Sequence, residues 1–367
     1  MKSKQSVFIF TLILAFACSV FAQTTQPTPP IEDEGEVIKV ESRLVVVPVS
    51  ILDAGGQPVL GLKAQDFRVA EDNKPQEITQ VGDAEKVPLE IALLFDVSAS
   101  TDAMFEFEQE TAAKFLQEVM RPGDRATIFT VGENATMIQA RGSADNSASA
   151  IKSIQPTKQQ TAFYDSVNVA AGYLQKNAPQ GTRKVIVVIS DGDDTNSKGV
   201  LDAIFAAERR IVRGDISREK LRDVRVKARD AAKIKEQEKV LRSLQNADAV
   251  FYSVNPGGNS YQLNQSSAFG QSNLQKFAEQ TGGTAFLPKF QPINLKDNLQ
   301  NSYNVRFNQG TLTKIFRQLA NELQSQYLVQ YYSDGNFPTN KYVKLNVGLN
   351  SPQNFRVRAR QGYFVKN

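Results

Sequence analysis

Apolar runs that carry no polar alternation recur through the middle of this chain. They lie at residues 91–95, 126–131, 184–189 and 249–254, with a shorter one at 284–287. A strand covered on both faces has this pattern, because neither of its sides meets water. Between the runs, apolar residues repeat at helical spacing, around residues 105–119, 163–174, 273–280 and 315–323. Strands alternating with helices predict a doubly wound α/β fold with a mostly parallel sheet.

Strand-like alternation precedes and follows this α/β region. Before it, Val45, Val47 and Val49 recur at period two, and further strand patterns start at Asp66 and Gln76. After it, strand patterns cover residues 327–332, 342–349, 355–359 and 362–364. We predict that the two β regions, residues 37–87 and 326–367, together form a small β-sandwich. The α/β domain, residues 88–325, would be inserted between them.

The N-terminal segment has the pattern of a secretory signal. Lys2 and Lys4 precede an apolar run over residues 7–21, and Val20-Phe21-Ala22 offers small residues at the positions that a signal peptidase reads. We expect cleavage after Ala22; an alternative is cleavage after Ala17, which would leave Cys18 as a lipid-modified N-terminus. Residues 23–36, rich in Thr, Pro and Gln, are typical of a disordered linker. The protein is therefore expected to be exported, to the periplasm, the outer cell surface or the medium, with no transmembrane segment in the mature chain.

The composition narrows the chemistry of any site. The chain has one Cys, which cleavage after Ala22 removes, and neither His nor Trp. A mature chain of this composition has no disulfide, no thiolate or imidazole zinc site and no nucleophile–histidine pair. The side chains that remain are mainly oxygen donors, which suit hard cations such as Mg²⁺, Mn²⁺ or Ca²⁺.

The basic charge of the chain is local. Its net charge is +4, yet residues 208–242 alone hold 13 Lys or Arg against 7 Asp or Glu. Aromatic residues, on which nucleic-acid bases would stack, do not interleave with these basic residues. We therefore expect no nucleic-acid partner.

Oxygen-bearing side chains follow the predicted strands at three places. Asp96, Ser98 and Ser100 form a D-x-S-x-S turn after the first buried strand, Thr161 precedes a predicted helix, and Asp191 ends the strand at residues 184–189. Loops at the carboxyl ends of strands in an open α/β sheet converge on one crevice. Two carboxylates and three hydroxyls meeting there would supply most of the oxygen shell of an octahedral cation.

At these positions the chain resembles the von Willebrand factor type A family, whose metal-ion-dependent adhesion site (MIDAS) has the same five residue types. The resemblance implies that Ser98, Ser100 and Thr161 contact the cation directly, and that Asp96 and Asp191 act directly or through water. The last coordination position would go to an Asp or Glu of a protein partner.

More narrowly, the chain looks like a bacterial group of exported proteins that carry this domain. The group has a D-F-x-V-x-E-D stretch, here residues 66–72, a late strand that reads Gln-Tyr-x-Leu/Val-x-Tyr-Tyr, here residues 326–332, and an R-x-R-x-G-Y-F ending, here residues 358–364. The resemblance covers about residues 37–365, apart from an insertion.

These features predict a metal-dependent protein-binding or adhesion module, not an enzyme, with specificity set by loops such as residues 255–271. One alternative is an envelope structural protein whose metal site only stabilises the fold. The other is a metal-dependent hydrolase, for which Asp165 and Lys184 are the nearest catalytic candidates. Asp165 is more simply interpreted as an acidic residue at the start of a helix, and Lys184 as a charged residue at the edge of a strand.

Two features near Asp191 have competing interpretations. One interpretation of Asp193 and Asp194 is a second cation site, but Asn196 stands where an EF-hand loop needs Gly, which favours a solvated loop. The segment 199–247 is an insertion, expected to form a protruding, coiled-coil-like helical hairpin. It would be either a solvated spacer or a partner-specific arm. Its predicted apolar stripe consists of Leu221, Val224, Ala228, Ala231, Ile234, Leu241 and Leu244.

Overall fold

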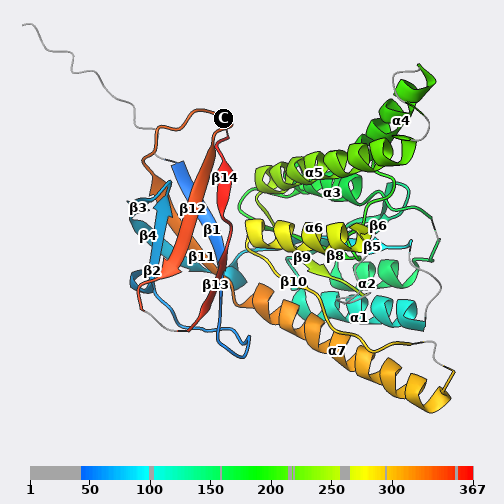
Figure 1. Cartoon of the computed structure of the whole chain (residues 1–367). Helices are drawn as coiled ribbons and strands as arrows, with labels where there is room; N and C mark the ends of the chain where they lie inside the picture. Colours follow the sequence, from blue (N-terminus) through cyan, green and yellow to red (C-terminus); the bar gives the residue numbers. More distant parts are fainter. Residues whose placement is uncertain are drawn as a thin grey trace, which may run out of the picture. The chain divides into compact units, whose positions relative to one another are not determined.

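A six-stranded sheet forms the centre of the α/β region in this computed structural model (Figure 1). The structure describes residues 43–98, 103–157, 159–213, 217, 220–256, 265–293, 296–351 and 354–366. The strand order is β10-β9-β8-β5-β6-β7, with β7 antiparallel to β6 and all the other neighbours parallel. The strands are β5 (Leu89–Asp96), β6 (Arg125–Val131), β7 (Ala135–Gly142), β8 (Arg183–Ile189), β9 (Ala249–Val254) and β10 (Ala285–Phe286).

Helices cover both faces of this sheet, as the apolar runs predict. All eight residues of β5 are buried, and its alternate side chains enter two different cores. Leu93 packs in the core that contains Phe115 and Leu319, whereas Leu94 packs in the core that contains Phe163. The helices are α1 (Ala103–Val119), α2 (Ala144–Lys152), α3 (Phe163–Asn177), α4 (Lys198–Val212), α5 (Leu221–Ala247), α6 (Gln265–Thr281) and α7 (Asn298–Gln324).

Strands from both ends of the chain form two antiparallel sheets. Their orders are β13-β1-β11-β4 and β14-β12-β2-β3, so N-terminal and C-terminal strands interleave around a shared apolar core. The predicted fold class, a doubly wound α/β region inserted in a small β-sandwich, is therefore confirmed. The strands are β1 (Arg43–Leu52), β2 (Phe67–Glu71), β3 (Lys74–Gln76), β4 (Ile78–Asp83), β11 (Tyr327–Ser333), β12 (Tyr342–Leu349), β13 (Arg356–Ala359) and β14 (Gly362–Phe364), with 3-10 turns at Ala64–Asp66 and Ala84–Lys86.

The expected signal peptide and linker lie outside the described residues, and so does Cys18. Within the described part of the chain, no helix is both long and apolar enough to cross a membrane.

The segment 199–247 forms the expected pair of helices, α4 and α5, but its predicted apolar stripe is only partly buried. Ala231 is exposed and the Ile234 side chain is 51% exposed. The face of α5 that is buried here carries Lys233, Glu236 and Gln237 instead. Lys233 contacts Asp193 and Gln237 contacts Asn273, both outside the hairpin, whereas Glu236 pairs with Lys239 of α5 itself. The C-terminal half of α5 therefore packs against the α/β domain and does not protrude.

Candidate metal centre

Asp96 is the last residue of β5, and its carboxylate organises the turn that follows. Its side chain is buried, with the residue only 7% exposed. One carboxylate oxygen, Oδ1, accepts hydrogen bonds from the Ser98 backbone N–H at 2.9 Å and from the Ser98 hydroxyl at 2.6 Å. The Asp-x-Ser spacing therefore produces a closed local turn that holds the first two predicted ligands together.

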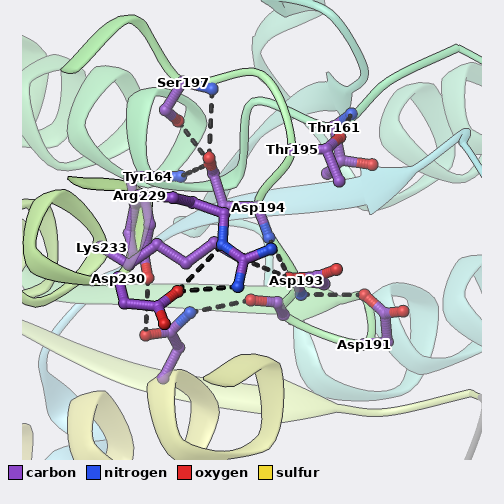
Figure 2. Close-up of polar contacts among 12 residues, drawn as sticks. Thr161, Tyr164, Asp191, Asp193, Asp194, Thr195, Ser197, Arg229, Asp230 and Lys233 are labelled. Atoms are coloured by element: carbon purple, nitrogen blue, oxygen red, sulfur yellow. Dashed lines mark hydrogen bonds and ion pairs between the residues drawn. The ribbon is translucent and has the colours of Figure 1, made fainter. Parts of the chain in front are cut away.

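Ser190 joins this turn to the loop after β8. Its hydroxyl donates to the second Asp96 oxygen, Oδ2, at 2.6 Å and accepts from the Gly192 N–H at 3.0 Å. Asp191 lies between them, and its Oδ1 accepts from the Asp193 N–H at 2.9 Å (Figure 2). Because β5 and β8 are parallel neighbours, both loops leave the same edge of the sheet.

Thr161 lies in the loop before α3, and hydrogen bonds join this loop to both of the other loops. Its carbonyl accepts from the N–H groups of Thr195 and Asn196 at 2.9 and 3.0 Å. Its own N–H donates to the Thr195 hydroxyl at 2.9 Å (Figure 2). Upstream in the same loop, the Thr157 N–H donates to the Val97 carbonyl at 2.9 Å. None of these bonds uses the Thr161 hydroxyl.

Four of the five predicted ligands thus lie on three loops that hydrogen bonds connect at one edge of the sheet. They are Asp96, Ser98, Thr161 and Asp191. Ser100 lies outside the described residues. Among the described side chains, no group of three or more Asp, Glu, His or Cys is placed to hold a metal ion, so a cation here would need the hydroxyls as well as the two carboxylates.

The electrostatics of the two carboxylates favour a cation beside them. Burial raises the pKa of Asp96, and the nearby Asp193 charge adds to the rise. Asp191 is exposed on one side, but desolvation by the protein around its carboxylate raises its pKa, with further contributions from the Asp96 and Asp193 charges. Desolvated carboxylates that repel each other are stabilised by a nearby positive charge. Their oxygens, together with serine and threonine hydroxyls, fit a hard divalent cation.

Gly192 lets helix α6 approach this loop. Its φ of +77° lies in the left-handed region, and a Cβ there would stand 2.5 Å from the Gly270 carbonyl oxygen. The carbonyl of Gly192 in turn accepts a hydrogen bond from the Asn273 side chain at 2.9 Å. A residue without a side chain is therefore required at this position.

Asp194 is not part of a solvated loop, so that expectation was wrong. The residue is 1% exposed, and its carboxylate accepts from the N–H groups of Tyr164 and Ser197, each at 3.1 Å, and from the Ser197 hydroxyl (Figure 2). Burial raises its pKa to about 6. Asp-x-x-Ser before a helix is a capping pattern, and it was the available sequence signal for this role.

Lys233 and Asn273 also escaped the sequence analysis. The Lys233 ammonium lies 2.8 Å from Asp193 Oδ1, and Asn273 accepts from the Tyr164 hydroxyl at 3.1 Å and from Gln237 at 2.9 Å. Lys233 lies in a highly charged helix and Asn273 in a polar one, so no local sequence pattern predicts these contacts.

The two residues named as hydrolase candidates have other positions. Asp165 Oδ2 accepts from the Lys198 N–H at 2.8 Å, so this carboxylate caps the start of α4. Lys184 stands near the beginning of β8, at the opposite end of the strand from Asp191. Neither side chain is placed as a base beside the candidate cation site.

A known protein family matches part of the α/β region. The family model "von Willebrand factor type A domain" matches residues 91–193. A search of curated proteins gave no significant match.

Similar solved structures share little sequence with this chain. Proximal thread matrix protein 1 from the mussel byssus, solved with a zinc-occupied MIDAS motif, is 14% identical over 69% of this chain and 50% of its own, with a TM-score of 0.40. This chain therefore spans about half of the mussel protein. An aerotolerance-related membrane protein from Bacteroides fragilis is 17% identical over 64% of this chain and 98% of its own, with a TM-score of 0.35. BatB from Bacteroides thetaiotaomicron is 16% identical over 62% and 99%, with a TM-score of 0.33. Residues 91–193, which include all five candidate ligands, therefore match the von Willebrand factor type A domain.

Proposed function

We propose that this protein is a metal-ion-dependent protein-binding or adhesion module of the bacterial cell envelope and that it has no catalytic activity. Asp96, Ser98, Ser100, Thr161 and Asp191 would hold one divalent cation. Mg²⁺ is the first choice, with Mn²⁺ and Ca²⁺ as alternatives. The cation would capture an Asp or Glu carboxylate of an exported partner.

One observation carries this proposal. Asp96 and Asp191, from neighbouring loops, lie close enough for the Asp96 charge to raise the Asp191 pKa, and the Ser190 hydroxyl fixes the Asp96 loop to the Asp191 loop. Such a paired, partly desolvated arrangement is unfavourable without a positive charge. It suits a cation that keeps an open position for an incoming ligand.

The cation and the neutral hydroxyl ligands would have different roles at this site. A bound divalent cation supplies a strong point charge for a partner carboxylate. The Ser98 and Thr161 hydroxyls add oxygen donors without adding negative charge, so the cation stays attractive to an anionic ligand. A metal–carboxylate contact of this kind needs both ions and gives specificity.

The Asp96→Ala variant tests the site. We expect Mg²⁺ binding, measured by isothermal titration calorimetry, to be lost in this variant. The control Asp334→Ala, which removes an exposed carboxylate paired with Lys74, should bind Mg²⁺ as the native protein does. Native protein that binds none of Mg²⁺, Mn²⁺ and Ca²⁺ would refute the metal site.

A pull-down from envelope extract tests the binding role. We expect partner capture by native protein, and its loss with EDTA or with Asp96→Ala. Capture that survives both treatments, with only a lower melting temperature, would favour the structural alternative. That alternative has an observation of its own, because both Asp96 oxygens are already hydrogen-bonded within the chain. Turnover of phosphoesters or peptides in Mg²⁺ would favour the hydrolase instead; we expect none.

A further inference from the structure

The inserted α4–α5 hairpin starts at the metal-site loop and packs back against it. Helix α4 begins at Lys198, directly after the loop that carries Asp191 and Asp193. Its first turn lies tightly against α5, since a Cβ on Gly199 would stand 2.0 Å from Glu236 Oε1. The base of the hairpin is therefore closed beside the candidate cation site.

Lys233 of α5 is a lysine whose side chain is almost completely buried. Its side chain is 2% exposed, and its ammonium contacts Asp193 Oδ1 at 2.8 Å (Figure 2). The same ammonium lies over the Phe269 ring, 5.5 Å from the ring centre. A buried ammonium is strongly unfavourable unless it is paired, so this ion pair has a definite geometry. The Asp193 N–H donates to Asp191 Oδ1, and the contacts thus run from Lys233 through Asp193 to a predicted ligand.

A second connection runs from the next turn of α5 to the same loop. Gln237 donates to Asn273 Oδ1 at 2.9 Å, and the Asn273 amide donates to the Gly192 carbonyl at 2.9 Å. Asn273 is fully buried. One face of α5 therefore reaches both the Asp193 side chain and, through Asn273, the backbone of Gly192.

We propose that Lys233 is a positioning residue for the candidate cation site, and that the inserted hairpin thereby sets the affinity of this site for its cation. The proposal rests on the proposed function, because it concerns the same site. Among the described ligand candidates, Lys233 contacts none; it acts by fixing Asp193, which orients Asp191.

Two physical effects of Lys233 have opposite signs, which makes the proposal testable. Its positive charge repels a cation, so a purely electrostatic role predicts tighter Mg²⁺ binding when the charge is removed. A positioning role predicts weaker binding, because the outer residues that orient metal ligands typically change affinity by about 10- to 100-fold. A purely structural role predicts a lower melting temperature with unchanged affinity.

The variant Lys233→Met keeps most of the side-chain volume and removes the charge. By calorimetric titration of the full chain with Mg²⁺, we expect a Kd at least about 10-fold higher than native. The control is Lys239→Met on the same helix, whose ammonium is paired with Glu236 and whose side chain is 60% exposed; its Kd should equal the native one. An unchanged or lower Kd for Lys233→Met would overturn the proposal.

Hydrogen exchange in EDTA gives a readout that does not need the metal. We expect faster exchange of the Asp193 and Asp194 amides in Lys233→Met than in native protein, and native rates in Lys239→Met. If native protein binds none of Mg²⁺, Mn²⁺ and Ca²⁺, the proposed function fails, while this measurement still decides whether Lys233 holds the loop. Should Lys233→Met not fold, Gln237→Met tests the second connection, with a weaker Mg²⁺ affinity expected and an unchanged one counting against the coupling.

Discussion

Asp194 is a single buried carboxylate that helps to fix the loop after β8. It accepts from two backbone N–H groups and from the Ser197 hydroxyl, so it anchors the start of α4 to the start of α3. Its burial is also unfavourable for its charge, which is why its pKa rises from 3.8 to about 6. Proton binding at this group is therefore linked to folding.

The pH dependence of stability tests this linkage. Because the folded pKa lies above the unfolded one, the native state holds the proton more tightly, and the contribution of Asp194 is full below about pH 4 and is lost as the pH rises through about 6. From pH 4 to pH 7 we expect the unfolding free energy of native protein to fall, relative to that of Asp194→Asn, by at most about 3 kcal/mol. Urea denaturation in EDTA measures it.

A matched variant separates this effect from general surface electrostatics. Asp145→Asn alters an exposed acid in the first turn of α2, and its difference from native should stay nearly constant over the same pH range. If the difference between native protein and Asp194→Asn also stayed constant, the Asp194 carboxyl would not be desolvated in the fold.

At the level of single residues, the sequence predicted the loops that carry the candidate ligands better than it predicted the residues that hold these loops in place. Asp96, Thr161 and Asp191 follow strands or precede helices, so their place at one sheet edge could be predicted from the fold class alone. Lys233 and Asn273 could not, because their contacts join elements far apart in the chain. Burial of a Lys depends on a partner that no local pattern reveals.

At the scale of elements, the strands that are buried on both faces were the easiest to predict. The runs at β5, β6, β8 and β9 are continuous and apolar, whereas β7 is mostly exposed and α2 buries only three residues, so neither stood out. Helix α5 gave a different error. Its apolar residues do lie at helical spacing, but the face that is buried combines Val240 and Leu244 with the polar residues Lys233 and Gln237.

Two apolar residues of α5 measure which face is buried. Leu244 is fully buried among the α3 and α6 side chains, whereas Ile234 is exposed. We expect Leu244→Ala to lower the free energy of unfolding by about 2–5 kcal/mol, because it leaves a cavity. Ile234→Ala should change it by less than about 0.5 kcal/mol. Urea denaturation of both variants checks this; a large loss for Ile234→Ala would mean that the hairpin packs on its other face.

For the whole molecule, the sequence predicted that strands from both ends form one sandwich, and the strand orders confirm it. The exact neighbours were not predictable, since alternation shows which face is buried but not which strand lies alongside. Strand β1 lies between β11 and β13, both from the C-terminal region, and β2 pairs with β12. The sandwich therefore cannot form until the entire α/β region has been synthesised.

Three sequence stretches of the sandwich meet at one buried carboxylate. Glu71 accepts hydrogen bonds from the hydroxyls of Tyr331, Ser333 and Tyr363, each at 2.7 Å. Glu71 lies in the D-F-x-V-x-E-D stretch, Tyr331 in the late strand and Tyr363 in the R-x-R-x-G-Y-F ending. Burial raises the pKa of Tyr363 to about 12, so its hydroxyl remains a donor at neutral pH.

Removing one donor should show how strongly this carboxylate joins the two ends of the chain. Hydrogen bonds to charged groups contribute about 1.5–3 kcal/mol, and Tyr363→Phe should lower the free energy of unfolding by that amount. Tyr332→Phe, at a side chain that is 52% exposed, should change it by less than about 0.5 kcal/mol. Urea denaturation at pH 7 compares the two. Equal stabilities would mean that Tyr331 and Ser333 satisfy Glu71 without help, and that the C-terminal strand is held by its apolar contacts alone.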